Sequence, residues 1–386
     1  MADRRCIVCN ETQSTQVFSK PYNLTGLGEV PMEIHVCERC GAVFQNPLPD
    51  LEKIRTTYRD MSNYTNPGRS GKPSATKINA VERQLDYLSQ HVDTKGSAFQ
   101  VGCSDGYTLH RFQKAGWEVD GIDPSTSAIA LAHKQYNLTL HNGFIEDYIH
   151  DGTLYDLIIL THVLEHFVDP ASVLQTCKKM LKADGFIFIE VPSLIDQSSW
   201  PTGYFTFEHL NYFSPVSMLN LMSQCGIEPV SPVATDFDIK DPYPIQMCIG
   251  KKSEQNLTIE KDKTALNMCC TYVERDQSLW HEINNKIKNA TNLAERICIW
   301  GAGVHTAQLL KETELLTLNK PIMMVDIDRQ KWGKQQNGIQ VCSPDEIAIE
   351  DPRLTIIISS FVFEQEIKQT LLNKPSLAAT VLTLYS

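Results

Sequence analysis

The sequence has no excess of basic residues, no long apolar run and no apolar segment near its start. Lys and Arg number 35 against 46 Asp and Glu, so the formal net charge is −11 over 386 residues. That balance disfavours a nucleic-acid partner, although it leaves room for a local basic pocket. The longest apolar runs, such as LYDLIIL and GFIFIEV, are too short to span a bilayer. The opening MADRRCIVCN is unlike a secretory leader, so we expect a cytoplasmic protein without a membrane partner.

Cysteine, in contrast, is plentiful, with 12 residues. Without secretory signals, this number favours reduced thiols or metal ligands over a disulfide framework. Two CxxC pairs lie near the start of the chain: Cys6 with Cys9, and Cys37 with Cys40. Thiolates at this spacing can grip one tetrahedral Zn²⁺ from two tight turns. We therefore predict a structural zinc site in a module of residues 1–50; the alternative is four free or redox-active thiols.

From about residue 97 the sequence alternates apolar strand-like segments with helical ones. SAFQV, WEVDGID, YDLIIL and FIFIEV have the composition of buried strands, and DPASVLQTCKKMLKADG begins with an Asp-Pro helix start. This alternation predicts an α/β fold with a parallel, doubly wound sheet, which binds ligands at the carboxyl ends of its strands. We expect this domain at residues 51–245, with a helical lead-in, and a helical linker at 246–290.

The first strand-to-helix turn, VGCSDG, carries three small residues: Gly102, Ser104 and Gly106. Glycines in such a turn let a ligand approach the backbone closely, although the dinucleotide fingerprint GxGxxG is not matched. Asp123 ends the second strand at a distance from the turn that suits hydrogen bonds to ribose hydroxyls. The alternative is that Asp123 only caps the helix that begins near Pro124.

Two further segments supply candidate binding residues. Phe144 and Ile145, in NGFIEDY, can sandwich an adenine ring or be plain core residues. The segment THVLEH, which follows the third strand, contains His162, Glu165 and His166. Its HxxEH spacing also occurs in a zinc motif, but that motif belongs on a helix, and here a buried strand leads in. Metal binding at this segment is therefore disfavoured.

VGCSDG, GIDPS, GFIED, YDLIILTHVLEHFVDP and GFIFIEVPS, in this order and spacing, resemble class I S-adenosylmethionine-dependent methyltransferases. The resemblance covers roughly residues 80–245. It implies a Rossmann-like methyltransferase core with S-adenosyl-L-methionine (SAM) as cofactor. It also implies that Gly102 and Gly106 lie beside the methionine part, that Asp123 holds the ribose, and that His162 lines the methionine side.

The last third of the chain has a second strand–turn–helix pattern. RICIWGAGVHTAQLLKE contains a GAG turn, and PIMMVDID is a strand that ends in acids. We predict a second, smaller Rossmann-like domain at residues 291–386. Its turn at Gly301 and Gly303, with Asp326, can bind a nucleotide, with a phosphate at the helix N-terminus. The alternative is that the glycines only form a tight turn.

The stretch TFEHLNYFSP places an acid and a base side by side among aromatic residues, just before a helix start. With the cysteine module and the trailing domain, the whole chain resembles the sugar C-methyltransferases of deoxysugar biosynthesis, which act on nucleotide-linked 4-keto sugars. The resemblance implies that His209 is the general base, with Glu208 as its neighbour, and that the substrate is a small molecule. Tyr204 or Tyr212 is then the candidate hydrogen-bond donor to the enolate oxygen.

The atom that receives the methyl group stays open. Thr206 stands where the C-methylating relatives usually have tyrosine, and EHLNYFS also occurs in enzymes that methylate sugar oxygen. The acceptor is therefore a carbon or an oxygen of a sugar. Two further hypotheses are a different small metabolite as acceptor, and a binding module that keeps the fold without catalysis.

Overall fold

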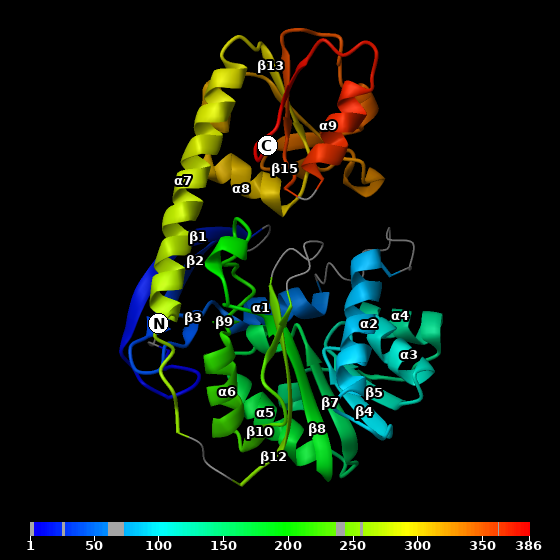
Figure 1. Ribbon diagram of the computed structural model, residues 1–386. Helices are drawn as coiled ribbons and strands as arrows, with labels where there is room; N and C mark the ends of the chain where they lie inside the picture. The colour runs from blue at the N-terminus through cyan, green and yellow to red at the C-terminus, as the bar shows by residue number, and fades with distance from the viewer. Residues whose placement is uncertain (1–3, 25–27, 61–72, 237–243, 255–257, 362) are drawn as a thin grey trace. The chain divides into compact units, whose positions relative to one another are not determined.

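The structure is a computed structural model (Figure 1), which describes residues 4–24, 28–60, 73–236, 244–254, 258–361 and 363–386. Residues 61–72, which belong to the polar stretch YRDMSNYTNPGRSGKPSATK, lie outside the described residues. The chain divides into two compact units, Met1–Val273 and Glu274–Ser386. Within the described residues, no helix is both long and apolar enough to cross a membrane.

The cysteine module forms a small antiparallel sheet in the order β1-β2-β3-β9. Its strands are β1 (Ser14–Leu24), β2 (Gly28–Cys37), β3 (Val43–Gln45) and β9 (Asn211–Tyr212). Strand β9 comes from the TFEHLNYFSP stretch, far along the chain, and pairs with β3 through Val43–Tyr212 and Phe44–Asn211. The module and that stretch are therefore one piece of structure.

The central sheet has the order β10-β12-β8-β7-β4-β5-β6, with β11 paired to β12. Its strands are β4 (Ser97–Val101), β5 (Glu118–Asp123), β6 (His141–Asn142), β7 (Tyr155–Thr161), β8 (Leu181–Pro192), β10 (Ile227–Pro229), β11 (Ala234–Asp236) and β12 (Ile245–Lys252). The pairs from β6 to β8 are parallel, whereas β10, β11 and β12 pair antiparallel. The predicted doubly wound α/β fold is confirmed.

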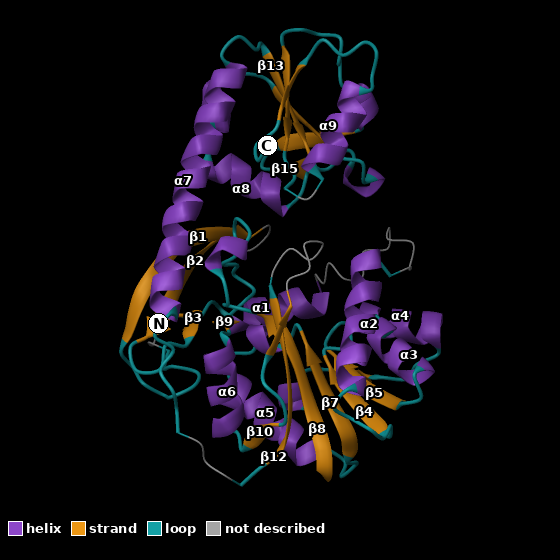
Figure 2. Cartoon of the chain, in the orientation of Figure 1, coloured by secondary structure: helices purple, strands orange, loops and turns teal. Residues whose placement is uncertain are grey.

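Helices cover both faces of this sheet (Figure 2). They are α2 (Ala75–Ser89), α3 (Tyr107–Lys114), α4 (Thr126–Tyr136), α5 (Pro170–Met180) and α6 (Pro215–Gln224). The same unit contains α1 (Leu51–Asp60) and the short 3-10 turns η2 (Ile145–Asp147), η3 (Leu164–His166) and η4 (Gln197–Ser199). One core joins α2 and α3 to Ile159 and Phe188, and the other joins α5 and α6 to Ile158 and Leu160. Because side chains alternate along a strand, one apolar strand supplies both cores.

The helices begin where the sequence predicts. The Asp169 side chain accepts from Ser172 N before Pro170, and Ser214 forms a capping box before Pro215. These caps satisfy amides that have no partner inside the helix. They also fix where the preceding loops end, including the stretch that carries His209.

The second unit contains a six-stranded sheet in the order β15-β16-β14-β13-β17-β18. Its elements are β13 (Arg296–Trp300), α8 (Val304–Glu312), η5 (Leu315–Leu318), β14 (Ile322–Val325), η6 (Arg329–Lys331), β15 (Gln335–Gln336), β16 (Ile339–Cys342), η7 (Pro344–Glu346), β17 (Leu354–Ile358), α9 (Glu364–Leu372) and β18 (Thr380–Leu382). The predicted second Rossmann-like domain is present. The predicted linker, residues 246–290, contains most of β12 and of one helix, α7 (Ala265–Thr291).

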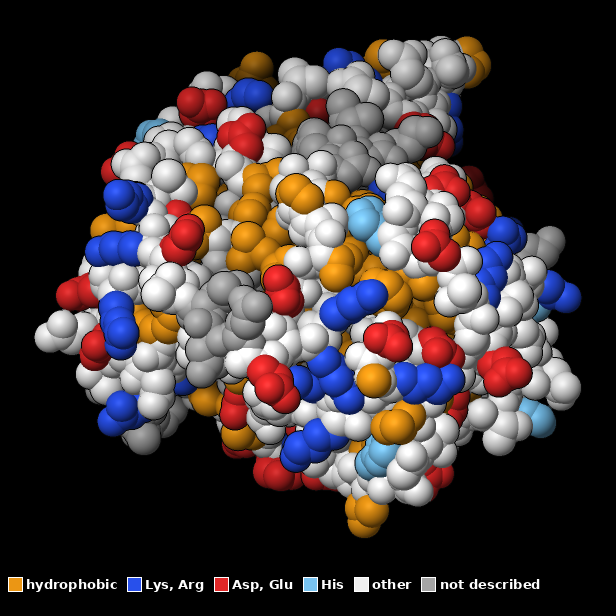
Figure 3. All heavy atoms as spheres, turned by 60° about the horizontal axis from the view of Figure 1, so that its bottom comes forward, with side chains coloured by type: hydrophobic (Ala, Val, Ile, Leu, Met, Phe, Trp, Pro, Cys, Tyr) orange, Lys and Arg blue, Asp and Glu red, His pale blue; other side chains and the backbone are white. Residues whose placement is uncertain are grey.

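On the face shown in Figure 3, acidic and basic side chains are interspersed, and no block of one sign dominates the view.

Candidate functional site

A cavity of about 650 Å³ lies at the carboxyl ends of the central parallel strands. Most of the predicted cofactor residues line it, namely Gly102, Ser104, Asp123, Phe144, Ile145 and His162. Glu208 and His209 line it from the TFEHLNYFSP loop, and residues of α1 and α2 complete the wall. The structure therefore brings the predicted cofactor turn and the predicted base to one cavity.

The turn after β4 is built around Asp123. Its Oδ2 accepts from Ser104 N at 2.8 Å, and its Oδ1 accepts from Ser125 N at 2.9 Å. Burial raises the pKa of Asp123 above its ordinary value, although the two amides oppose that shift. Gly102 has φ +68°, and a Cβ there would lie 2.3 Å from Val163 Cγ1, so only glycine fits. Asp123 thus fixes the turn and still faces the cavity.

Gly106 is not among the cavity-lining residues. It has φ +76° and precedes α3, and a Cβ there would lie 2.7 Å from Ala132 Cβ on α4. Its position assigns it to helix packing, so the predicted contact with the cofactor has no support from the geometry.

The side of the cavity near η2 combines an aromatic ring with a cation. Arg55 Cζ of α1 lies 4.2 Å from the centre of the Phe144 ring, and the guanidinium also pairs with Asp147. Ile145 is buried and belongs to the core beneath. Phe144 is thus placed to stack on a planar ring. Arg55 could not be found from the sequence, because nothing local links α1 to this segment.

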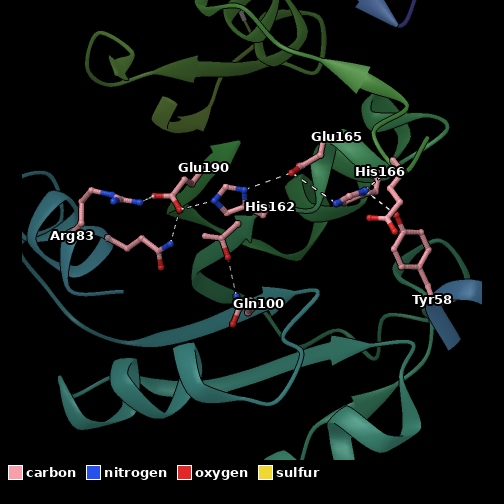
Figure 4. Close-up of polar contacts among 10 residues, drawn as sticks. Tyr58, Arg83, Gln100, His162, Glu165, His166 and Glu190 are labelled. Carbon is pink, nitrogen blue, oxygen red and sulfur yellow. Dashed lines mark hydrogen bonds and ion pairs between the residues drawn. The ribbon is translucent and has the colours of Figure 1, made fainter. Parts of the chain in front are cut away.

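A chain of charged and polar groups crosses the cavity floor (Figure 4). His162 Nε2 lies 3.3 Å from Glu190 Oε1, and His162 Nδ1 lies 3.7 Å from Glu165 Oε1. Glu190, at the end of β8, is fully buried; it accepts from Gln84 Nε2 at 2.7 Å and pairs with Arg83 at 3.6 Å. An acid inside the apolar segment FIFIEVP was the sequence signal for Glu190.

His162 is the strained member of this chain. Its φ is +53°, which is uncommon for a residue other than glycine and clusters at functional sites. Burial alone lowers the pKa of His162, but the carboxylates of Glu165 and Glu190 outweigh burial and raise the pKa to about 10. The two buried carboxylates therefore favour the imidazolium form of His162.

Glu165 connects His162 to the predicted base. Neither of its carboxylate oxygens accepts a hydrogen bond from any described residue, and the residue is 1% exposed. Burial raises the pKa of Glu165, but His162, His166 and His209 together lower it to about 2. Glu165 is thus a buried anion that faces histidines and the cavity.

His166 and His209 lie beside Glu165. His166 Nδ1 donates to the backbone carbonyl of Glu208 at 2.8 Å and lies 2.8 Å from the Tyr58 hydroxyl, so its Nε2 points at Glu165 Oε1, 3.8 Å away. The rings of His166 and His209 meet edge to face at 5.0 Å. Burial, and then the charge of His166, lower the pKa of His209 to about 3. The lowered pKa favours the neutral form of His209, which has one unprotonated ring nitrogen.

Glu165, His166 and His209 also have the chemistry of a divalent-metal site. One ligand atom from each lies within 4.8 Å of the others. Two imidazoles and one carboxylate suit several divalent transition metals. This set differs from the HxxEH set considered in the sequence, because His209 replaces His162.

Tyr204 and Tyr212 are not among the cavity-lining residues. Both are buried in an aromatic cluster with Trp200 and Tyr272. The Tyr204 hydroxyl donates to Ser193 O at 3.2 Å, and the Tyr212 hydroxyl donates to Thr206 O at 2.9 Å. Neither hydroxyl is placed to stabilise an oxyanion, so that role does not fit this geometry.

The four predicted metal ligands are gathered near the N-terminus. Cys6 Sγ lies 3.5 Å from Cys40 Sγ, and Cys9 Sγ lies 3.4 Å from Cys37 Sγ. All four sulfur atoms lie within 4.8 Å of one another. Four sulfurs around Zn²⁺ at Zn–S distances of about 2.3 Å are separated by about 3.8 Å, so the cluster fits zinc.

The glycine turn of the second unit has a different setting. Asp326 Oδ2 accepts from Ala302 N and from Lys331 Nζ, both at 2.8 Å, and Oδ1 accepts from Asp328 N at 2.8 Å. Nearby, Ser359 Oγ lies 2.8 Å from both His305 Nδ1 and Thr306 Oγ1. The predicted nucleotide contacts of Asp326 stay a prediction.

Comparison with known proteins identifies the central domain. A family model described as a methyltransferase domain matches residues 76–231, which include β4, β5, β7 and β8. A second model, described as C2185-like, N-terminal, matches residues 293–376. The first match agrees with the prediction that this part of the chain is a methyltransferase domain.

Curated relatives share the same segment. The ubiquinone biosynthesis O-methyltransferase of Actinobacillus pleuropneumoniae serotype 7 is 33% identical over 156 residues, which are 37% of this chain and 63% of that protein. The enzyme of the same name from Coxiella burnetii is 31% identical over 145 residues, 36% of this chain and 61% of that protein. The chain thus spans less than two thirds of the length of these relatives.

Similar solved structures include two methyltransferases. The 1,6-didemethyltoxoflavin-N1-methyltransferase of Burkholderia thailandensis, with bound 1,6-didemethyltoxoflavin and S-adenosylhomocysteine, has a TM-score of 0.44 and 14% identity, covering 61% of this chain and 100% of that one. The magnesium protoporphyrin IX methyltransferase of Synechocystis PCC 6803, with bound S-adenosylhomocysteine, has a TM-score of 0.42 and 12% identity, covering 53% and 100%.

Proposed function

We propose that the protein transfers a methyl group from SAM to a small acceptor molecule, with His209 as the general base. The observation that carries the proposal is that neutral His209 shares one cavity with the turn at Gly102 and Asp123. A cofactor and a base that meet in one cavity are what methyl transfer to an acidic O–H or C–H requires.

The cavity residues fit SAM. Asp123 faces the cavity at the second strand, where ribose hydroxyls bind in such sheets. Gln100 Oε1 is buried and has no hydrogen-bond partner among the described residues, so it suits an ammonium group such as that of methionine. Phe144 supplies a face for adenine. When bound there, SAM supplies an electrophilic methyl group.

His209 and Glu165 then form the acid–base pair. His209 takes the acceptor's proton, and the imidazolium that results lies beside the buried Glu165 carboxylate. That carboxylate stabilises the charged ring, as an acid does in a catalytic triad. Glu208, the neighbour in sequence, is exposed, so Glu165 is the better partner.

Oxygen is the better-supported acceptor atom. The relatives are named O-methyltransferases. Tyr204 and Tyr212, which were expected to stabilise an enolate, donate their hydroxyl hydrogens to backbone carbonyls instead. C-methylation of a nucleotide-linked 4-keto-deoxysugar is the second candidate. It is favoured by the FEHLNYFS loop and by the order of the cysteine module, methyltransferase core and second Rossmann-like domain.

The test is a matched pair of acceptors. The full chain is incubated with SAM in deuterated buffer, with a nucleotide-linked 4-keto-6-deoxysugar or with its 4-hydroxy counterpart, and products are read by mass spectrometry and NMR. We expect a methyl ether on the hydroxy sugar. Deuterium exchange beside the ketone and a new C–CH₃ bond would instead establish the second candidate. Absence of SAM binding by calorimetry would contradict the proposal as a whole.

An experiment with a chelator distinguishes a general base at His209 from a metal bound by Glu165, His166 and His209. We expect activity after a short EDTA treatment that leaves zinc bound at the four cysteines to equal that in buffer, because a proton at His209 needs no ion. Loss of activity that returns with Mg²⁺ or Mn²⁺ would assign Glu165, His166 and His209 to a metal instead.

We also propose that Cys6, Cys9, Cys37 and Cys40 hold one structural Zn²⁺. The sulfur geometry supports this, and four thiolates leave no open coordination position for chemistry. Metal analysis of the native protein should find one zinc per chain. A native protein without zinc would contradict it.

A further inference from the structure

The loop that carries His209 is held by a residue of the cysteine module. Gln45, at the end of β3 and 1% exposed, directs its side-chain Nε2 at three backbone carbonyls, those of Thr206, Phe207 and His209, at 3.0, 3.1 and 3.2 Å. Its backbone N–H donates to Leu210 O at 2.9 Å. One side-chain amide thus gathers the carbonyls on both sides of Glu208 and sets the curvature of the loop.

Arg4 holds the far end of the same loop. Arg4 is 9% exposed. Its guanidinium donates to Leu210 O at 2.9 Å and to the Asn211 side-chain oxygen at 2.8 Å. It also donates to Val168 O, just beyond η3. Its backbone N–H donates to the Asn46 side chain at 2.8 Å, so Arg4 and β3 are tied to each other.

Asn211 links the loop to η3, which contains residues that face His209. Its side-chain amide donates to Phe167 O at 2.7 Å and lies 3.3 and 3.4 Å from the carbonyls of Leu164 and Glu165 in η3. The loop that carries His209 and the turn that carries Glu165 are therefore fixed against each other. Both are fixed through side chains of the cysteine module or groups bonded to it.

We propose that Arg4 and Gln45 are positioning residues for His209, and that the cysteine module in this way holds the loop that carries His209. This inference rests on the proposed function. Arg4 lies two residues before Cys6, and Gln45 lies five after Cys40, so both residues belong to the cysteine module. Both side chains donate to backbone carbonyls of this loop, and Arg4 also donates to the side-chain amide of Asn211. Removing either donor would therefore loosen the loop.

The expected effect is on turnover and not on cofactor binding. Neither Arg4 nor Gln45 is among the residues that line the cavity, and neither contacts Asp123 or Gly102 in the described structure. A base displaced by about 1 Å costs about 100-fold in rate. Replacing Gln45 by leucine removes the donor at similar size, and Arg4→Ala removes the guanidinium.

The test compares Gln45→Leu and Arg4→Ala with two controls. Arg5→Ala changes the next residue, whose exposed guanidinium donates to Asn10 O, and Gln16→Leu changes an exposed glutamine on β1. We expect kcat to fall at least tenfold in the first two variants, with SAM affinity within twofold of the parent. Arg4→Lys should recover part of kcat. Both controls should stay within twofold in kcat.

A second readout does not need turnover. Hydrogen exchange of peptides over residues 204–212 should be faster in Gln45→Leu and Arg4→Ala, and unchanged in the controls. If the parent protein methylates nothing, the proposed function fails, while faster exchange still supports the hold on the loop. Unchanged exchange, or kcat within twofold in both variants, would overturn the positioning role. If Arg4→Ala fails to fold, Gln45→Leu decides.

Discussion

Each unit of this chain contains a glycine turn after one strand and an acid at the end of the next, yet the two acids have different surroundings. In both, the carboxylate accepts from an amide of the turn, Ser104 N for Asp123 and Ala302 N for Asp326. Asp326 also carries the Lys331 ammonium at 2.8 Å, whereas Asp123 faces a cavity.

The neighbouring polar groups differ in the same way. In the second unit, the Ser359 hydroxyl is hydrogen-bonded to both His305 and Thr306. In the first, Glu165 and Gln100 keep buried oxygens that have no hydrogen-bond partner among the described residues. Because an unpaired buried polar group is costly, such groups indicate where a ligand supplies the missing partner. The same turn can thus be a ligand site or a finished piece of packing.

The base should separate the two units most clearly. His209→Ala should lower kcat by about 10²–10⁴-fold, the usual contribution of a general base, with SAM affinity unchanged. His305→Ala, the matched change in the second unit, should leave kcat within about twofold. Steady-state kinetics and calorimetry check both, and full activity in His209→Ala would remove the base assignment.

The acids provide the next test. Asp123→Ala should weaken SAM binding by about 10–100-fold, because a hydrogen bond to a charged group contributes about 1.5–3 kcal/mol. Asp326→Ala should leave SAM affinity within about twofold, since Asp326 bonds within its own unit. Titration calorimetry measures both, and an equal loss in the two variants would erase the distinction drawn between them.

The glycines should differ in stability. Gly102→Ala places a methyl group 2.3 Å from Val163 Cγ1 at positive φ, so unfolding free energy should fall by about 1–3 kcal/mol. A Cβ at Gly303 meets nothing within 4 Å, and Gly303→Ala should stay within about 0.5 kcal/mol. Denaturant unfolding tests this, and a larger cost at Gly303 would contradict the open space beside that turn.

The smallest expected effect is a pair of opposite pH dependences. The pKa of His162 is raised from 6.5 to about 10, so its stabilisation is complete below pH 6.5 and is lost between pH 6.5 and 10. Burial lowers the pKa of His305 to about 4, so its contribution is lost as pH falls from 6.5 to 4. His162→Gln should therefore destabilise more at pH 6 than at pH 9.

The His162 slope should be modest, because 42% of that side chain is exposed to the cavity. His305→Gln should show the reverse trend, with a larger cost at pH 7 than at pH 5. Unfolding curves at each pH measure these differences, and slopes of equal sign would contradict the comparison.

The features that depend on local sequence pattern could be predicted. Strand and helix order, the caps at Asp169 and Ser214, and the cavity-lining positions of Asp123 and His209 follow from residues close together in the chain. Glu165 could not be predicted as the partner of His209, because Glu208 is the neighbour of His209 in the sequence. Arg4 and Gln45 could not be found either, because their partners in the loop that carries His209 lie more than 160 residues away. Such pairings depend on the completed fold, and no periodicity records them.

The pairing of β3 with β9 also sets an order of events during synthesis. The cysteine module leaves the ribosome first, but its sheet gains its last strand only when Asn211 and Tyr212 have been made. Contacts at such separation form late, because a long loop must close before they can stabilise anything. Until then, the edge of β3 has no β9 to pair with, and the Arg4 guanidinium lacks its acceptors at Leu210 and Asn211. The loop that carries His209 can therefore be held by β3 only after most of residues 76–231 have been made.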